Sequence, residues 1–580
     1  MPLPLRPLPT TAAALVHRYN RLLSAAGVSS SSSSLRALLP IHARAVVLGI
    51  ATNPAFATSL LAVAAPCSLA YARRVFDAAP HRDVYMWNTL LRVHAHSHAE
   101  PQSSALSLYK RMRAAGVAPD HYTYPIVLPA CAAARAPRLG RAAHGDAVRF
   151  ALAGDCFVHS ALIAMYCQDG DVADAEQVFL GTAGASRTVV SWTAMVAGYV
   201  QNCFFGEAIA VFGAVVAEGV LPNEITLISF LPCLQGQEWL TAGEMVHGFA
   251  LKLRFDANVP LLNALVAMYG KCGSVLSAKG LFDGMATRTL VSWNTMVAMY
   301  EQNSDGVQAI KFFRRMLTEK VGFDCVTLVS VLSACARSGA LETGKWVHEL
   351  ARSHGLDNDA RIGNVLVDMY AKCGEIAYAR EVFDSLREPG VVSWSAMISA
   401  YANHGEHQEA LKLFSLMKGE GVKPNSFTVT AVLVACGHSG LVDEGLKHFN
   451  SIAMEYQMSP TLEHYACMLD MLGRAGRLVE AYEIIRGMSV QPDKCVWGAF
   501  LGGCRLHCNL ELAEFVANDL FQSGSNDVTF YVLMANMYFE AGMLEDAERM
   551  RRAMKEMELK KTAGHSSVVR TSTERGGITR

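Results

Sequence analysis

The chain of 580 residues contains 15 cysteines, but no two of them are spaced C-x-x-C. This absence excludes the paired-cysteine half of many zinc and redox sites. The cysteines at positions 131, 233, 335 and 436 instead recur 102, 102 and 101 residues apart. We interpret them as small buried thiols at helix contacts in a reducing compartment, and we expect no metal and no other cofactor.

Charge is also scarce. Only 18% of the residues are charged, and the formal net charge is −1. A protein that binds nucleic acid through bulk attraction to phosphate is strongly basic, so this composition excludes that class. Any binding of nucleic acid must therefore depend on specific contacts. Apolar residues make up 51% of the chain, which is enough material for a long continuous core.

Acidic residues are absent from the chain before Asp77. Within residues 1–40, the stretch ALVHRYNRLLS predicts a basic amphipathic helix. This composition is typical of a disordered organelle transit peptide, and its arginines favour the mitochondrion over the chloroplast. A disordered terminus without an address is the alternative. The longest uncharged run, 45–72, contains prolines, so we predict helix pairs there and no membrane insertion.

Four tryptophans give the chain its period. They lie 105, 101 and 101 residues apart, each in a phrase similar to V-S-W-N. A period this long predicts a stack of similar units with a groove for a long ligand. Each period divides into units of about 35, 35 and 31 residues. Apolar residues three and four apart, on both sides of a polar turn, predict two antiparallel helices per unit. The tryptophans are Trp87, Trp192, Trp293 and Trp394.

These units resemble the P, L and S motifs of plant pentatricopeptide repeat (PPR) proteins. The phrases MYGKCG at 268–273 and MYAKCG at 369–374 carry the resemblance together with the V-S-W phrases. It implies an all-α fold, a right-handed α-solenoid superhelix of stacked helix-turn-helix repeats over residues 41–493. We assign P motifs to 84–120, 189–223, 290–324 and 391–425, L motifs to 121–155, 224–258, 325–359 and 426–461, and S motifs to 54–83, 156–188, 259–289, 360–390 and 462–493.

The pattern changes after residue 493. The stretch VWGAFLGGCRLH from Val496 resembles the first extension (E) motif of the family, and YVLMANMY from Tyr531 resembles the second. We therefore assign two E motifs to 494–561 and a short tail to 562–580. This layout implies a site-recognition factor for C-to-U RNA editing that recruits a deaminase in trans. We expect that the chain is not an enzyme and that it lacks a DYW deaminase domain. The zinc site of a deaminase needs an H-x-E sequence and a C-x-x-C sequence, and only H-x-E occurs in this chain.

The resemblance implies that each repeat reads one base of single-stranded organelle RNA through its fifth and last residues. The second residue of a P motif would lie between bases, at Val190, Val291 and Val392. The L motifs have Pro125, Ile228 and Val329 in fifth place, which cannot bond a base edge. The pairs are Asn88 with Asp120 for U, Thr193 with Asn223 for A, Asn294 with Asp324 for U, Ser395 with Asn425 for A, Ser160 with Thr188 for a purine, and Asn263 with Thr289 and Asn364 with Gly390 for a pyrimidine.

Several alternatives stay open at this point. Asn and Asp at unit boundaries also suit helix caps. The tryptophans could stack on bases, although packing in the core is the better interpretation. Residues 494–561 would bind the deaminase and other editing factors. The chain could instead support splicing, stabilisation or translation of an organelle transcript, or act as a protein-binding helical scaffold.

Overall fold

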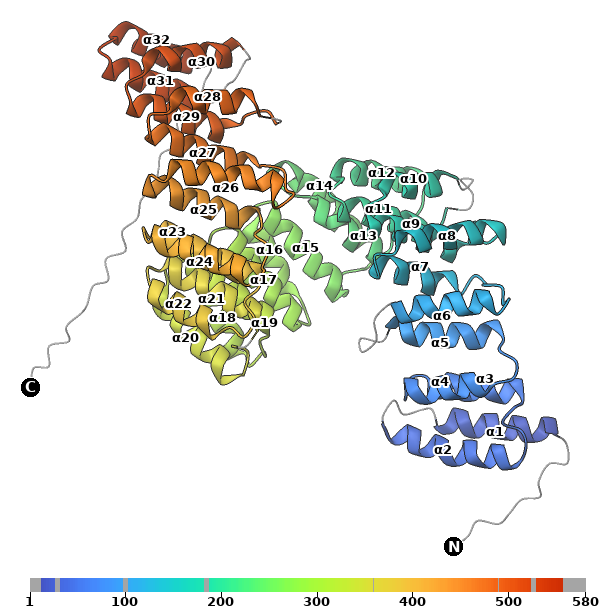
Figure 1. Ribbon diagram of the computed structural model, residues 1–580. Helices are drawn as coiled ribbons and strands as arrows, with labels where there is room; N and C mark the ends of the chain where they lie inside the picture. The colour runs from blue at the N-terminus through green and yellow to red at the C-terminus, as the bar shows by residue number, and fades with distance from the viewer. Residues whose placement is uncertain are drawn as a thin grey trace, which may run out of the picture. The chain divides into compact units, whose positions relative to one another are not determined.

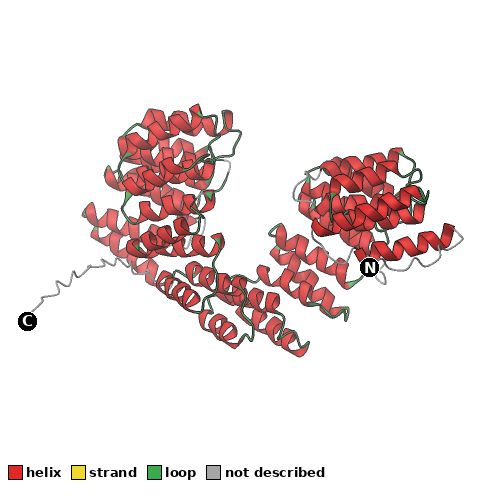
Figure 2. Cartoon of the chain, turned by 90° about the horizontal axis from the view of Figure 1, so that it is seen from below, coloured by secondary structure: helices red, strands yellow, loops and turns green. Residues whose placement is uncertain are grey.

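The computed structural model describes residues 12–26, 32–96, 103–181, 187–357, 359–488, 490–522 and 528–556. Every regular element within these ranges is a helix (Figure 2). None of the helices described there combines the length and apolar character needed to cross a bilayer. The predicted tail 562–580 lies outside the described residues.

The chain forms two compact units, residues 1–299 and 300–580, and α17 contains the division between them. The helices of the first unit are antiparallel hairpins in chain order (Figure 1). They are α1 (Ala12–Ala26), α2 (Ser32–Val47), α3 (Pro54–Ala64), α4 (Leu69–Ala78), α5 (Val84–His96), α6 (Ser103–Ala114), α7 (Tyr124–Ala133), α8 (Pro137–Arg149), α9 (Cys156–Asp169), α10 (Val172–Gly181), α11 (Val189–Gln201), α12 (Phe205–Ala217), α13 (Glu224–Phe230), α14 (Leu240–Lys252), α15 (Val259–Lys271), α16 (Val275–Gly284) and α17 (Leu290–Gln302).

The second unit continues the same pattern. Its helices are α18 (Gly306–Thr318), α19 (Cys325–Ser338), α20 (Leu341–Ser353), α21 (Ala360–Lys372), α22 (Ile376–Ser385), α23 (Val391–Asn403), α24 (His407–Gly419), α25 (Ser426–Ser439), α26 (Val442–Met454), α27 (Leu462–Arg474), α28 (Leu478–Arg486), α29 (Lys494–Leu506), α30 (Leu510–Gln522), α31 (Val528–Glu540) and α32 (Leu544–Glu556). The first helix of each hairpin packs on the first helix of the next, so that α19, α21, α23, α25, α27, α29 and α31 form a continuous row.

The periodic tryptophans are core residues, as the sequence indicates. Trp192 is 2% exposed, and its ring meets Phe179 of the preceding hairpin edge-on at 4.8 Å. The equivalent pair Phe383 and Trp394 has its ring centroids 5.0 Å apart. Edge-to-face packing of this kind stabilises beyond simple burial. The tryptophans therefore join successive hairpins and are not available as stacking platforms for bases.

Small residues let the helices approach closely. A Cβ on Gly344 of α20 would lie 2.4 Å from Met369 Sδ of α21. The periodic cysteines fill similar positions, since Cys131, Cys233, Cys335 and Cys436 are at most 3% exposed. Their burial raises the thiol pKa to about 12 in each case. Thiols of this kind are inert packing groups, as predicted.

One first helix is shorter than predicted. The L motif 224–258 was expected to begin with a full helix, but α13 ends at Phe230 and two short 3-10 turns follow it. Pro232 lies in the first of these turns, and its ring favours an end of the α-helix there without requiring it, because it lacks an amide donor and crowds the preceding turn. Gly236 then reconnects the chain to its neighbour by donating its amide to Lys271 O at 3.2 Å.

The amino-terminal segment also differs from the predicted disorder over residues 1–40. Within the described part, α1 packs on α2 and on α3 (Figure 1). Val16, Tyr19 and Leu23 of α1 are at most 8% exposed, and the rings of Tyr19 and Phe56 lie 6.4 Å apart. The apolar stripe of the basic helix is therefore buried by the array. Its role as a transit peptide stays a prediction.

Candidate RNA-binding groove

A groove of about 620 Å³ lies over the row of first helices in the second unit, on α21, α23 and α25. Three predicted base-reading residues line it: Asn364, Ser395 and Asn425. Val392 and Phe427 line the same groove, and these side chains are 56% and 58% exposed. The groove thus combines hydrogen-bonding groups with apolar side chains left in contact with solvent.

The predicted pair of motif 391–425 is brought together by a third residue. Ser395 Oγ lies 2.6 Å from the hydroxyl of Thr428 and 3.3 Å from Asn425 Oδ1. The amide and the hydroxyl of Thr428 both donate to Asn425 Oδ1 at 2.8 Å. Asn425 is the N-cap of α25, so the capping interpretation and the base-reading interpretation describe one side chain.

Motif 84–120 shows the same arrangement. Asn88, which is 5% exposed, donates its side-chain amide to Asp120 Oδ1 at 2.9 Å. The hydroxyl of Thr123 lies 2.8 Å from Asn88 Oδ1 and from Asp120 Oδ1. The two predicted base-reading residues are therefore direct hydrogen-bond partners, although they are 32 residues apart in the chain.

In motif 189–223 the connection runs through Thr226. Its hydroxyl lies 2.6 Å from that of Thr193, and it donates to Asn223 Oδ1 at 2.9 Å. In motif 290–324, Asn294 belongs to the first compact unit and Asp324 to the second. Asn294 is 8% exposed, and Asp324 caps α19 by accepting from the Thr327 amide at 2.9 Å.

The S motifs behave differently. Within the described residues, no hydrogen bond joins the fifth residue of an S motif to its last residue. Ser160 donates to Cys156 O of its own helix at 2.9 Å, whereas Thr188 caps α11 together with Ser191. The remaining S-motif residues show the same separation: Thr289 caps with Ser292, Gly390 has no side chain, and the buried Oδ1 atoms of Asn263 and Asn364 have no hydrogen-bond partner among the described residues.

Sequence reasoning missed a threonine that follows each P motif and that joins the predicted pair in motifs 84–120, 189–223 and 391–425. Thr123, Thr226, Thr327 and Thr428 are all 0% exposed, and they recur 103, 101 and 101 residues apart. The signal in the sequence is a repeated [D/N]-x-x-T after each P motif, which is a reciprocal capping box. Because the pattern is also an ordinary helix start, it does not by itself indicate a ligand.

A second missed feature is apolar. The predicted base-sandwiching residues Val190, Val291 and Val392 are 47%, 60% and 56% exposed. Large apolar side chains occupy the same second place in the L motifs, to which the sequence analysis assigned no role, and they are similarly exposed. These L-motif residues are Tyr122 at 58%, Ile225 at 63%, Val326 at 50% and Phe427 at 58%.

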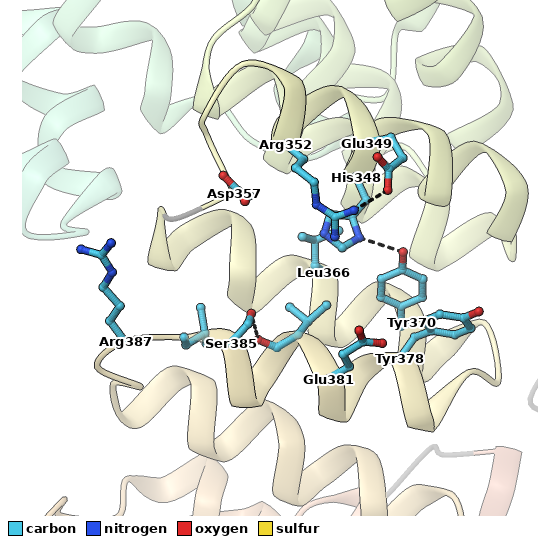
Figure 3. A pocket seen from close by; sticks show the side chains of 12 residues that line it. His348, Glu349, Arg352, Asp357, Leu366, Tyr370, Tyr378, Glu381, Ser385 and Arg387 are labelled. Carbon is cyan, nitrogen blue, oxygen red and sulfur yellow. Dashed lines mark hydrogen bonds and ion pairs between the residues drawn. The ribbon is translucent and has the colours of Figure 1, made fainter.

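Another pocket, of about 340 Å³, lies between α20, α21 and α22 (Figure 3). His348 Nδ1 is 2.9 Å from the hydroxyl of Tyr370, and Arg352 pairs with Glu349 at 2.7 Å. Burial lowers the pKa of His348 and raises that of Tyr370 to about 12. None of the predicted base-reading residues lines this pocket. The same contact recurs at 2.9 Å in His144 with Tyr166 and His247 with Tyr269, which marks it as a joint between hairpins.

Side chains that could bind a metal ion do not cluster in the described part of the chain. Within the described residues, no three His, Cys, Asp or Glu side chains are grouped so as to hold a metal ion. Cys504 and Cys508, the cysteines with the closest spacing, differ in environment, since Cys504 is buried and Cys508 is exposed. Lys372 is paired with Asp368 at 2.8 Å, and both residues line the groove.

Family profiles match much of the chain. The PPR repeat matches residues 157–180, 190–220, 261–289, 291–321, 364–391 and 463–490, and the PPR repeat family matches 389–438. The E motif matches residues 507–569, which overlaps the predicted 494–561. These matches agree with the repeat units that the structure folds as hairpins.

Curated relatives and solved structures agree with the profiles. A mitochondrial pentatricopeptide repeat-containing protein of Arabidopsis thaliana is 38% identical over 83% of this chain and 77% of its own length. A chloroplastic one is 37% identical over 96% of this chain and 68% of its own length. The crystal structure of PPR10 from maize shares the fold, with a TM-score of 0.52 and 18% identity over 96% of this chain and 92% of its own. PPR10 in complex with an 18-nt psaJ RNA element gives a TM-score of 0.53 at 20% identity, over 96% and 93% of the two chains. The predicted all-α solenoid of stacked repeats is thus confirmed, and the chain belongs to the pentatricopeptide repeat family.

Proposed function

We propose that this chain binds single-stranded organelle RNA base by base and marks a cytidine for C-to-U editing by a deaminase recruited in trans. The groove on α21, α23 and α25 carries the proposal. Ser395 and Asn425 line it together with two exposed apolar side chains, Val392 and Phe427. A flat base inserted there would contact apolar groups on its faces and hydrogen-bonding groups at its edge.

Three further observations support this reading. The solved structure of PPR10 with an RNA element has the same fold. The near-neutral charge agrees with contacts to base edges in place of bulk attraction to phosphate. The relatives named above are mitochondrial or chloroplastic proteins, so we place this chain in an organelle and prefer the mitochondrion.

The E motifs supply the partner surface in this proposal. Helices α29 to α32 follow the last S motif, and the E motif profile covers 507–569. In the proposed mechanism the repeats bind the RNA, and residues 494–561 hold the deaminase and other editing factors. The chain then provides the specificity and the partner provides the chemistry.

A change of base preference tests the RNA-reading claim. The double substitution Ser395→Asn and Asn425→Asp should convert the preferred base facing motif 391–425 from A to U. The expected discrimination is about 1–3 kcal/mol, as for a well-placed pair of hydrogen bonds to a base edge. The measurement is fluorescence anisotropy with four RNA oligonucleotides that differ only at that nucleotide. An unchanged preference would contradict base reading at this pair.

The editing claim needs a separate experiment. In a plant that lacks the chain, transcriptome sequencing should show loss of C-to-U conversion at a small number of organelle sites. Complementation with the full chain should restore those sites, whereas a version without residues 494–580 should bind the RNA and restore none. If all editing sites are intact in the null plant and a transcript is instead lost or unspliced, the role in splicing or stabilisation is the correct one.

A further inference from the structure

The buried threonines after the P motifs have a feature that capping alone does not require. Each hydroxyl reaches across to the fifth residue of the preceding motif wherever both residues lie in one compact unit. Thr123 reaches Asn88 at 2.8 Å, Thr226 reaches Thr193 at 2.6 Å, and Thr428 reaches Ser395 at 2.6 Å. A helix cap involves only residues near one helix end, so this contact across two helices calls for another explanation.

The hydrogen bonds fix which end of the Asn425 amide faces inward. Its Oδ1 accepts from the Thr428 amide at 2.8 Å, from the Thr428 hydroxyl at 2.8 Å and from Ser395 Oγ at 3.3 Å. The backbone amide of Thr428 can only donate, so Oδ1 must be the inward atom and Nδ2 the outward one. Among the described residues no group pairs with Nδ2, and Asn425 lines the groove. The outward atom is therefore a hydrogen-bond donor.

At Asp120 the inward atom is Oδ1, and it has more hydrogen-bond partners than Oδ1 of Asn425. Its Oδ1 accepts from Asn88 Nδ2, from the amides of Tyr122 and Thr123, and lies 2.8 Å from the Thr123 hydroxyl. Within the described residues Oδ2 has no hydrogen-bond partner. Here the outward atom is an acceptor.

These two outward atoms match two classes of base. Adenine and cytosine present an unprotonated ring nitrogen on their Watson–Crick edge, which requires a donor such as Asn Nδ2. Uracil and guanine present a ring N–H, which requires an acceptor such as Asp Oδ2. We infer that the threonine is a specificity-determining positioning residue, because it holds one terminal atom of the boundary Asn inward and presents the other to the base. The inference rests on the proposed RNA binding and deepens it.

An amide and a carboxylate differ in their need for this residue. The two ends of the Asn425 amide are chemically different, so rotation about the last side-chain bond would replace the donor with an acceptor. The hydroxyl and the backbone amide of Thr428 both hold Oδ1 inward, and removal of the hydroxyl leaves one of these two donors. The two oxygens of Asp120 are equivalent, and Asn88 Nδ2 already orients the group at 2.9 Å. The threonine should therefore control base choice beside Asn and have little effect on it beside Asp.

This difference gives a test with a matched control. Thr428→Val and Thr123→Val remove the same hydroxyl from the same buried place, one beside Asn and one beside Asp. Each full-length variant is titrated with two sets of four RNA oligonucleotides. One set varies only the nucleotide that faces motif 391–425, and the other varies only the nucleotide that faces motif 84–120.

In the unmodified chain we expect a preference of about tenfold or more for A at the first nucleotide and for U at the second. Thr428→Val removes one of the two donors that hold Oδ1 inward, so it should reduce the preference for A over G and U and leave the second nucleotide unaffected. Thr428→Ser should keep the original preference, because it retains the hydroxyl. Thr123→Val should keep the preference for U. Should Thr428→Val fail to fold, Thr226→Val beside Asn223 provides the same measurement at motif 189–223.

The outcomes separate the inference from the proposed function. An unmodified chain that shows no preference at either nucleotide contradicts base reading itself. A preference that Thr428→Val leaves undiminished overturns the positioning role and leaves base reading intact. Equal loss of affinity for all four bases, with the ratio between them unchanged, also overturns it, because a purely structural role predicts that result.

Discussion

The Asn or Asp that ends each P motif uses its two terminal atoms differently. In motifs 189–223, 290–324 and 391–425 one atom of this residue caps the next helix, and in motif 391–425 the residue also lines the groove. In motif 84–120 Asp120 accepts from the Thr123 amide in the turn before α7. The [D/N]-x-x-T pattern recurs with about the period of the tryptophans. A residue that looks purely structural in the sequence is thus in a position to bind a base.

The exposed apolar residues at the second place give a prediction at this scale. Val392→Ala should weaken RNA binding by about 1–3 kcal/mol without changing which base is preferred, because contact with the face of a base does not distinguish bases. Anisotropy with the four-base RNA set measures both quantities. Val307→Ala is the control, since Val307 on α18 is equally exposed, at 55%, and does not line the groove. An equal effect of both substitutions would argue against the groove as the binding surface.

The joints between hairpins should respond to acid. Burial lowers the pKa of His144, His247 and His348 below the ordinary value of 6.5. Unfolding raises each pKa, so the unfolded chain binds more protons in mildly acidic solution. Their contribution to stability is complete above about pH 6.5 and is lost as the pH falls through the lower pKa of the folded state.

We therefore expect the melting temperature to decrease between about pH 7 and pH 5, and the decrease to become smaller in a variant with all three histidines changed to Gln. The measurement is a thermal melt by circular dichroism across that range. His81→Gln is the control, because His81 is exposed. A slope that is the same in the triple variant and in the control would show that the buried histidines are not responsible.

At the scale of helices, the last S motif and the first E motif meet backbone to backbone. A Cβ on Gly503 of α29 would lie 2.6 Å from Gly473 Cα of α27, and backbone cannot rotate away as a side chain can. Gly503→Ala should destabilise this junction by about 1–3 kcal/mol, because overpacking forces the helices apart.

Gly502→Ala is the matched control for that substitution. A Cβ on Gly502 would meet nothing within 4 Å, so this change should be neutral or slightly stabilising by about 0.5–1 kcal/mol through helix propensity. Thermal melts and limited proteolysis of the full chain compare the two. Similar stability of both variants would show that the contact between α27 and α29 is looser than the structure indicates.

The elements also show where sequence reasoning succeeds and where it stops. The V-S-W phrases identify the hairpins because a buried tryptophan against a phenylalanine is required once per period. Proline is a weaker guide. Pro129 and Pro232 occupy the same place in two L motifs, yet α7 continues past Pro129 and α13 ends before Pro232. The outcome depends on packing with neighbouring helices, which local sequence does not specify.

The same limit applies to the candidate site and to the amino terminus. The residue types of the P-motif pairs are visible in the sequence, but Thr428 becomes important only when α23 and α25 are placed side by side. Residues 1–40 have the composition of a leader, whereas the burial of Val16, Tyr19 and Leu23 depends on the array being present to receive them. Contacts between residues far apart in the chain decide both features.

For the whole molecule, the central claim is that P motifs at every third unit read alternating bases along one RNA strand. Selection of RNAs from a random pool by the full chain tests it most directly. The account predicts enriched RNAs that carry U, A, U and A in that 5′ to 3′ order, each three nucleotides from the next, facing motifs 84–120, 189–223, 290–324 and 391–425. Enrichment of RNAs with no shared bases at this spacing, or with another order of bases at these four places, would contradict it.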